Sequence, residues 1–385
     1  MFNLEIFGVG LLGWFLKDIL FIDEEYSWVF KNRDMNFLIG VLVVILYLMV
    51  LMVNLNYKFR LNLMFIILLY LIAVRDLVVF FYLYEMIFIL IMFSIILLGY
   101  SYERLLASFL IMFYSFLFSR PILMIVLLFD HRFLIKNWLR YSLIINYFLV
   151  GSFMVKFPIF GFHYWLPVAH VEASTVGSII LAGLLLKSGS VGLIYVVIYI
   201  NFIVKLHWLA LGVVLVMLMI LRLRDLKMMI AYSSVAHITI MFYVIMWGTM
   251  VGKKGAVYIM FYHGFISPLI FWVVGILAWW KTRSLIVIKL ISFSYLFLLC
   301  LFMLVILNIG FPPFLGFLRE VLMLKALITN SLILWVLVFR VLLRCYYNIY
   351  LFWCFNGFMG IVFKLNFFRI DLFIFLGLAI FLNLY

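Results

Sequence analysis

Long apolar runs recur along this chain from residue 4 to residue 384, and they restrict the possible folds more than any other feature. Hydrophobic residues make up 70% of the sequence and charged residues only 11%. A hydrocarbon core about 30 Å thick is crossed by about 20 helical residues, and only helices or closed barrels satisfy their backbone hydrogen bonds there. A barrel strand would alternate apolar and polar residues, whereas these runs are apolar on all sides. The sequence therefore predicts an all-α polytopic membrane protein.

The apolar runs predict about 12 to 14 transmembrane helices packed into one bundle. The loops between the runs are short and cannot form a soluble domain, so a single transmembrane domain over residues 1–385 is expected. The predicted spans cover residues 4–22, 36–53, 61–74, 77–99, 105–129, 141–165, 172–199, 206–221, 228–248, 254–280, 285–328, 332–353 and 367–384.

Three ionisable residues stand within apolar runs, where a bilayer disfavours charge: Glu85, Lys156 and Lys187. A charged side chain at mid-membrane costs roughly 2.5 to 3.5 kcal/mol even on lenient insertion scales. Such residues therefore face a protein interior or a wet cavity, and they commonly mark ion pathways. These positions predict a chain that moves ions or protons.

Helix-breaking residues follow Lys156 and precede a further charged residue, Glu320. Pro158 and Gly161 come shortly after Lys156, and residues 310–316 hold two glycines and two prolines before Glu320. Proline removes an amide donor and frees the carbonyl four residues earlier, and inside lipid such groups need partners. A packing kink would explain the prolines alone, but a charge beside each break favours an ion site. The sequence thus predicts two broken helices.

Lys156 and Lys187 lie on consecutive predicted spans and could bind and release protons. Burial disfavours the charged form of a lysine, whereas a nearby carboxylate favours it, so the two effects compete. Glu85 is the candidate partner for Lys156, because it lies mid-span with no cation beside it in sequence. A static buried ion pair is the alternative, but that reading leaves Lys187 without a partner.

Four histidines extend this series of titratable groups: His163 and His170 near the first break, and His237 and His263 in later spans. Histidine titrates closest to physiological pH and can both accept and donate through its ring nitrogens, so it suits a proton chain. An interhelical hydrogen bond is the alternative for either of the later histidines. A metal site built from His163, His170 and Glu172 is disfavoured, because no His-Glu-x-x-His spacing is present.

Several ligand classes lack a recognisable motif. The three cysteines have no Cys-x-x-Cys spacing that would hold zinc or an iron–sulfur cluster. No Gly-x-Gly-x-x-Gly turn or phosphate loop indicates a nucleotide. The N-terminus shows no basic segment or small-residue cleavage site, so no removable signal peptide is predicted. The net charge of +14 comes mainly from short loops, as at Arg222 and Lys227, which favours anionic lipid over nucleic acid as the counter-charge.

The residues around the first break resemble a known signature. The matching segments are residues 157–173, 177–178, 181–187, 224–227, 230–237, 263–264 and 312–313, followed by Glu320. They occur in the order and at nearly the spacings of NADH–ubiquinone oxidoreductase chain 4. The chain therefore resembles this family of antiporter-like membrane subunits of respiratory complex I from about residue 75 to residue 353. The Ala-His-Val-Glu-Ala run at residues 169–173 favours chain 4 over its antiporter-like paralogues.

The resemblance implies a proton channel that has no redox centre of its own. Seven positions of this chain match the family's proton-carrying residues. These are the carboxylate–lysine pair Glu85 and Lys156, His163 beside the first break, the central Lys187, the connecting His237 and His263, and the terminal Glu320. No cofactor-binding or metal-binding residue is implied in this chain.

Enzyme activity is implied only at the level of a complex. The family's chains are subunits of NADH:ubiquinone reductase (H+-translocating), so NADH, FMN, iron–sulfur clusters and ubiquinone are expected in partner subunits. Expected partners are other membrane-arm subunits, including neighbouring antiporter-like chains, and anionic phospholipid such as cardiolipin. The 44 phenylalanines and the short loops favour an organelle-encoded subunit in the mitochondrial inner membrane.

The chain also departs from the family at several places, of which two bear most on the predicted helices and site. The segment before Glu85 is about one helix shorter, which divides the chain into N-terminal helices (1–75), an antiporter-like core (76–353) and a C-terminal helix (354–385). Arg319 stands beside Glu320, where a glycine is common.

Two other functions remain open. A subunit of a multi-subunit cation/proton antiporter is the first, since such relatives resemble the same central segment. A transport-inactive structural spacer of the membrane arm is the second, although the presence of Lys156, Lys187 and Glu320 counts against it.

Overall fold

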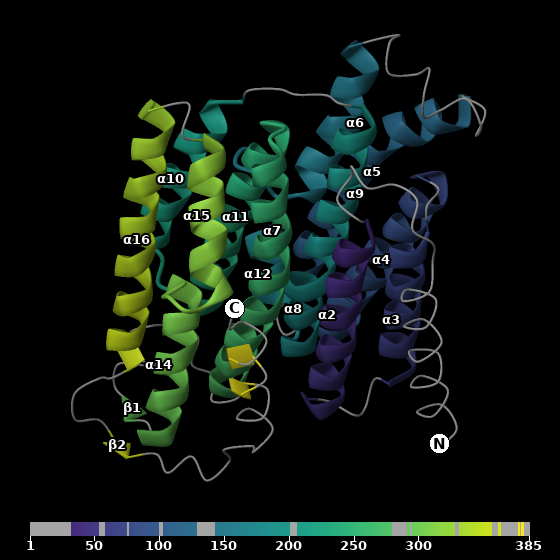
Figure 1. The fold of residues 1–385 in the computed structure, drawn as a ribbon. Helices are drawn as coiled ribbons and strands as arrows, with labels where there is room; N and C mark the ends of the chain where they lie inside the picture. The colour runs from purple at the N-terminus through teal and green to yellow at the C-terminus, as the bar shows by residue number, and fades with distance from the viewer. Residues whose placement is uncertain are drawn as a thin grey trace.

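A computed structural model of the chain describes residues 32–53, 58–74, 77–99, 103–128, 143–200, 206–278, 291–292, 295–327, 331–355, 361–362, 376–377 and 379–380, and helices dominate it (Figure 1). The helices are α2 (Asn32–Val53), α3 (Lys58–Ala73), α4 (Leu77–Leu98), α5 (Arg104–Leu128), α6 (Leu143–Lys156), α7 (Trp165–Glu172), α8 (Thr175–Ile180), the π-helical segment η2 (Leu181–Leu185), α9 (Leu186–Ile200), α10 (Trp208–Ile220), α11 (Leu226–Met246), α12 (Met250–Ala278), α14 (Tyr295–Ile309), α15 (Leu315–Leu327) and α16 (Ser331–Phe355). Two short strands, β1 (Ile291–Ser292) and β2 (Ile361–Val362), pair in parallel.

The helices stand side by side in one bundle, with α3 and α4 toward one end, α14 and α16 toward the other, and α11 and α12 between them (Figure 1). Helix α12 packs against α8, α11 and α15. Helix α11 is apolar on nearly all sides, and a helix of that kind is stable only when it is surrounded. Almost all of its side chains are buried accordingly. The polar side chains at Ser233, Ser234, His237 and Thr239 of α11 therefore point into protein rather than into lipid.

Five helical segments of the described chain are long and apolar enough to cross a membrane. They are Val79–Leu97, Thr175–Ile194, Leu226–Met246, Met250–Ile276 and Trp335–Phe355. Shorter apolar helices, such as Trp208–Ile220 and Phe297–Ile309, accompany them. The predicted all-α membrane fold is confirmed. The predicted spans 4–22 and 367–384 lie wholly or largely outside the described residues, as do parts of the predicted N-terminal and C-terminal regions, so the division into three regions stays a prediction.

The first predicted break lies between α6 and α7. Helix α6 ends at Lys156, and the chain continues without a regular helix through Pro158 to Trp165. The indole Nε1 of Trp165 donates a hydrogen bond to the carbonyl oxygen of Val155 at 3.0 Å, so a side chain satisfies a carbonyl that the interrupted helix leaves open. The break places Lys156 at a helix end inside the bundle.

The second predicted break separates α14 from α15. Gly310 ends α14 with φ of +79°, a left-handed conformation that a residue with a Cβ rarely adopts, and the Pro312–Pro313 peptide bond is cis. Helix α15 then begins at Leu315, so Glu320 lies in its second turn. Both predicted broken helices are therefore present.

The predicted span 172–199 contains two irregularities that the sequence patterns did not indicate. Helix α7 ends at Glu172 and α8 starts at Thr175, with the Ser174 hydroxyl accepting a hydrogen bond from the Gly177 amide at 3.2 Å. The five-residue π-helical segment η2 then precedes α9. Such π segments widen one turn of a helix and are frequent at functional sites. Here the segment ends two residues before Lys187.

Lys227 was expected in a short loop, and this expectation is wrong. It lies in the first turn of α11 and is 1% exposed. Its Nζ donates to the carbonyl oxygen of Ala173 at 3.0 Å, just beyond the C-terminus of α7. A cation at a helix C-terminus is favourable because it faces the negative end of the helix dipole.

Candidate functional site

Glu85 and Lys156 form an ion pair between α4 and the end of α6. The Nζ of Lys156 donates a hydrogen bond to Oε1 of Glu85. Lys156 is 2% exposed, whereas the side chain of Glu85 is 19% exposed. The ammonium also lies 4.6 Å from the ring centroid of Tyr84 and 5.1 Å from that of Phe81, within the range of cation–π attraction. The carboxylate and the rings together hold a charge in an otherwise apolar place.

Lys187 is buried at the start of α9 and reaches two acceptors. Its Nζ donates to the carbonyl oxygen of Ala182 in the π-helical segment and lies 3.0 Å from Nδ1 of His263 on α12. A charged lysine only donates hydrogen bonds, so Nδ1 of His263 accepts and carries no proton in this arrangement. The π segment interrupts the regular helical ladder, which allows the Ala182 carbonyl to face a side chain.

His263 and His237 continue the series from α12 to α11. Their ring centroids are 5.1 Å apart, with 52° between the ring planes. A cavity of about 10 Å³ lies at this junction, and its polar lining comes from Lys187, Ser190, His237 and His263. That volume approaches the space one water molecule needs, roughly 10 to 15 Å³. The junction between the lysine and the two histidines therefore has space for at most one water molecule.

His237 is held on its far side by an arginine of α16. The Nη2 of Arg340 lies 2.8 Å from Nδ1 of His237. A guanidinium has donors and no acceptor, so Nδ1 of His237 accepts and Nε2 carries the proton of the neutral ring. The orientation of this histidine is thus set by Arg340.

Glu320 lies in α15 among arginines. The Nη1 of Arg344 donates to Oε1 of Glu320, and Nη2 of Arg319 lies 3.9 Å from the same oxygen. The Arg319 guanidinium also stacks 4.3 Å from the ring centroid of Tyr262 on α12. The predicted terminal carboxylate is therefore paired rather than isolated.

The structure brings five of the seven predicted residues into two groups. Lys187, His263 and His237 lie next to one another, linked by one hydrogen-bond contact and one ring contact, and we call them the row; Glu85 with Lys156 forms a separate pair. No hydrogen bond or ion pair joins Lys156 to Lys187 among the residues described, although the hydroxyl of Tyr84, next to Glu85, donates to the Leu185 carbonyl at 3.4 Å. Glu320 pairs with Arg344, whereas His237 contacts Arg340, and no hydrogen bond or ion pair joins Glu320 to the row among the residues described.

His163 lies apart from the row, in the first break. Its Nδ1 accepts a hydrogen bond from the Gly161 amide at 3.3 Å, and its ring stacks on Phe160 with centroids 5.7 Å apart. His170 stacks on Phe271 instead. In the described part of the chain, no group of three His, Cys, Asp or Glu side chains is placed to hold a metal ion.

Arg340 and Arg344 were missed by the sequence reasoning. Both lie within the apolar span predicted for residues 332–353 and are separated by four residues, so they share one helix face. A charge within an apolar span is as costly for these two arginines as it is for Lys187, so they too are expected to face the protein interior. Their position within an apolar run could have identified them, but only lysines, histidines and carboxylates were considered as candidates.

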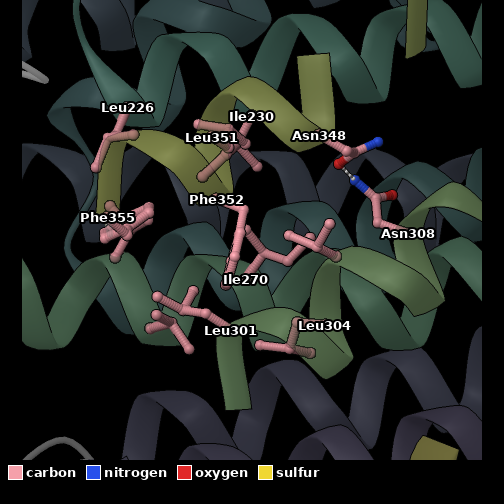
Figure 2. Close-up of a pocket in the computed structure, with 13 residues that line it drawn as sticks. Leu226, Ile230, Ile270, Leu301, Leu304, Asn308, Asn348, Leu351, Phe352 and Phe355 are labelled. Carbon is pink, nitrogen blue, oxygen red and sulfur yellow. Dashed lines mark hydrogen bonds between the residues drawn. The ribbon is translucent and has the colours of Figure 1, made fainter. Parts of the chain in front are cut away.

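A second cavity lies between α11, α12, α14 and α16 and is shown in Figure 2. Its volume is about 30 Å³, whereas a pocket for a drug-sized ligand measures roughly 300 to 1,000 Å³. Its polar side chains, Asn308 and Asn348, point toward each other and share a hydrogen bond of 2.7 Å (Figure 2). This cavity has room for water but not for a substrate, and the amide pair fastens α14 to α16.

The chain matches a known protein family and several curated proteins. Residues 74–344 match the family described as "NADH:quinone oxidoreductase/Mrp antiporter, TM". Among curated proteins, NADH-ubiquinone oxidoreductase chain 4 of Apis mellifera ligustica is 32% identical over 95% of this chain and 80% of its own length. The Ceratitis capitata protein of that name is 31% identical over 86% of this chain and 73% of its own. The Acanthamoeba castellanii protein is 39% identical over 52% of this chain, and that alignment spans only 42% of its own length.

Solved structures with the same fold come from respiratory membrane complexes. A chain of the archaeal membrane-bound sulfane sulfur reductase superposes with a TM-score of 0.79 at 18% identity, over 90% of this chain and 78% of that one. A chain of respiratory complex I from Thermus thermophilus superposes with a TM-score of 0.76 at 21% identity, over 91% and 79%. The overall helical bundle is therefore a shared architecture.

Proposed function

The chain belongs to the NADH-ubiquinone oxidoreductase chain 4 family, within the wider NADH:quinone oxidoreductase/Mrp antiporter family, and on this premise we propose that it carries protons along the row Lys187–His263–His237. It is a proton-translocating subunit in the membrane arm of a quinone-reducing complex. The observation that carries the proposal is the buried contact of Lys187 with His263, together with the adjacent ring of His237. Buried groups of this kind are costly in a membrane and are typical of proton relays.

The contacts of the three side chains support one order of proton transfer. Lys187 passes a proton to the unprotonated Nδ1 of His263, and His263 releases the proton on its other nitrogen toward the small cavity beside His237. While Arg340 donates to Nδ1, the ring proton of His237 stays on Nε2, so the nitrogen away from Arg340 cannot accept the arriving proton. Onward transfer therefore requires Arg340 to turn away, which makes this arginine a gate at the end of the row.

The Glu85–Lys156 pair acts on the row through charge. While Glu85 neutralises Lys156, the region around the neighbouring lysine carries little excess positive charge. When the pair opens, the uncompensated Lys156 charge repels a proton on Lys187 and favours its transfer toward His263, because charges in this low-dielectric interior are weakly screened. In this role the pair is a switch and not a fixed structural bridge.

The pair can be tested with two variants. Glu85→Gln is expected to assemble, because three nearby rings still face Lys156 and Glu85 is partly exposed, but it should pump several-fold less per electron. The double variant Glu85→Gln with Lys156→Met should also assemble and stay inactive. Assembled complex is quantified on native gels and pumping in reconstituted vesicles. Recovery of pumping in the double variant would mean that the pair is only structural.

Gly264 allows Lys187 to reach His263. A Cβ at this position would lie 3.2 Å from Cε of Lys187 and 2.6 Å from Cδ1 of Leu42. Gly264→Ala should therefore displace the ammonium and lower the proton-to-electron ratio, while overpacking costs roughly 1 to 3 kcal/mol of stability. Gly151→Ala is the matched control, since nothing lies within 4 Å of a Cβ there. An unchanged ratio in assembled Gly264→Ala would count against the placement of Lys187.

The family and the composition support a proposal for the cellular setting. We place the chain in the mitochondrial inner membrane, next to other membrane-arm subunits that include antiporter-like chains. NADH, FMN, the iron–sulfur clusters and ubiquinone belong to partner subunits of the complex. The excess of 28 Lys and Arg over 14 Asp and Glu supports contact with anionic phospholipid such as cardiolipin.

The experiment that tests the function is the proton-to-electron ratio of the isolated complex in sealed vesicles. The proposal predicts proton uptake coupled to NADH oxidation that does not need Na+ or K+ gradients. A strict requirement for such a gradient would instead favour the cation/proton antiporter. If variants that block the row keep the proton-to-electron ratio of the unmodified complex, the chain would instead be a transport-inactive structural spacer.

A further inference from the structure

Three buried arginines surround a single carboxylate at the end of the row. Arg319, Arg340 and Arg344 are each 2% exposed or less, and they come from α15 and α16. Within the described chain, Glu320 pairs with Arg344 and lies 3.9 Å from Arg319, whereas Arg340 contacts His237 instead. His237 accepts a hydrogen bond from Arg340 but brings no negative charge. The cluster therefore carries an excess of two positive charges.

The unsatisfied atoms of this cluster are almost entirely hydrogen-bond donors. Within the described residues, the unpaired buried guanidinium nitrogens include Nε of Arg340, and Nε and Nη2 of Arg344. On Arg319, all three guanidinium nitrogens lack a hydrogen-bond partner. The hydroxyl of Tyr262, whose ring stacks on Arg319, is also buried without a partner. Arginine nitrogens only donate, and a tyrosine hydroxyl can donate. The missing partner is consequently an acceptor.

Charge distinguishes an anion from a water molecule as that acceptor. Water could receive the hydrogen bonds, but it would leave two uncompensated charges in a low-dielectric interior, where buried charges are normally paired. The arginine side chains are already enclosed by this chain alone, so the side chain of a neighbouring subunit cannot reach them without opening the packing of α12 against α15. A monatomic ion needs far less space than the side chain of a neighbouring subunit.

We propose that Arg319, Arg344 and Arg340, with the Tyr262 hydroxyl, bind one small inorganic anion, with chloride as the expected species. The ion does not contact Glu320 itself. It accepts hydrogen bonds from the arginine donors that Glu320 leaves unsatisfied. It would reduce the electrostatic barrier that the cluster raises against a proton arriving from His237. The binding itself does not depend on the proton-transfer proposal, because occupancy is measured without turnover.

The direct test uses the unmodified complex. The intact complex is imaged by electron cryomicroscopy after equilibration in chloride, in bromide, and in gluconate as the only anion. A density peak within hydrogen-bonding distance of Arg319 and a second arginine should be stronger in bromide than in chloride and absent in gluconate. A peak of equal strength in all three buffers would be water and would overturn the proposal. An empty cluster, or a carboxylate from a neighbouring subunit in that place, would overturn it too.

A variant gives an independent measurement. Arg319→Gln leaves the Arg344–Glu320 and Arg340–His237 contacts in place but removes the guanidinium with the most unsatisfied donors. The bromide concentration needed for half-occupancy should rise roughly tenfold or more, since hydrogen bonds to charged groups are the strong ones. Arg222→Gln, on an exposed arginine, is the control and should bind as the unmodified complex does. Equal bromide occupancy in Arg319→Gln would contradict the site.

Discussion

Replacing Lys187 with methionine is expected to stop proton transfer through this chain while the complex still assembles. Methionine keeps a similar length and packs as an apolar side chain, so the buried space stays filled. It removes the ammonium that donates to the Ala182 carbonyl and to His263, and no other side chain of the described row can load His263. The proton-to-electron ratio should fall by the whole share that this chain contributes.

Lys254→Met is the matched control for this change, because Lys254 is exposed on α12 and lies outside the row. Both variants are purified as intact complex, reconstituted in vesicles and compared at equal NADH oxidation rates. Lys254→Met should keep the full ratio. A full ratio in Lys187→Met would show that protons take another path.

Glu320→Leu is expected to have the largest effect on assembly. The substitution removes the carboxylate that pairs with Arg344 and lies near Arg319, and it leaves the buried arginines without an acidic partner in the described chain. Removing one partner of a buried ion pair costs roughly 3 to 5 kcal/mol, because the remaining charge is uncompensated. Since whole domains are stable by only about 5 to 15 kcal/mol, little assembled complex should accumulate.

The double variant Glu320→Leu with Arg344→Leu separates charge imbalance from loss of volume. Removing both members of the pair deletes the uncompensated charge, so assembly should recover in part. Native gels that quantify assembled complex provide the readout. Normal amounts of assembled Glu320→Leu would show that the Glu320 carboxylate is not needed to balance the charge of the buried arginines.

Several features could be predicted because they depend on local sequence. The apolar runs located the helices, and α4 and α16 differ from their predicted spans by only one or two residues at most ends. Pro158 and the segment 310–316 marked both breaks, since proline cannot continue the helical ladder. The partnership of Glu85 with Lys156 was expected from the cost of leaving either charge alone in a bilayer.

Other features depend on tertiary contacts that no local pattern records. The π-helical segment before Lys187 sits where α12 packs closely, and its sequence, Leu181–Leu185, has the composition of an ordinary apolar helix. The arginine bound to His237 comes from α16, 103 residues further along the chain. Lys227 was read as a loop residue because it follows Arg224 and Asp225, yet tertiary packing buries it against the end of α7.

The account is tested most directly by combining Lys187→Met with His263→Leu and measuring the proton-to-electron ratio of each single variant and of the double. If both residues belong to one series, either block alone removes the whole contribution of this chain, and the double variant loses no more than each single. Such non-additivity is the expected result for groups that act as a unit. Losses that add, with the double pumping clearly less than either single variant, would show two separate paths and contradict the single row from Lys187 through His263 to His237.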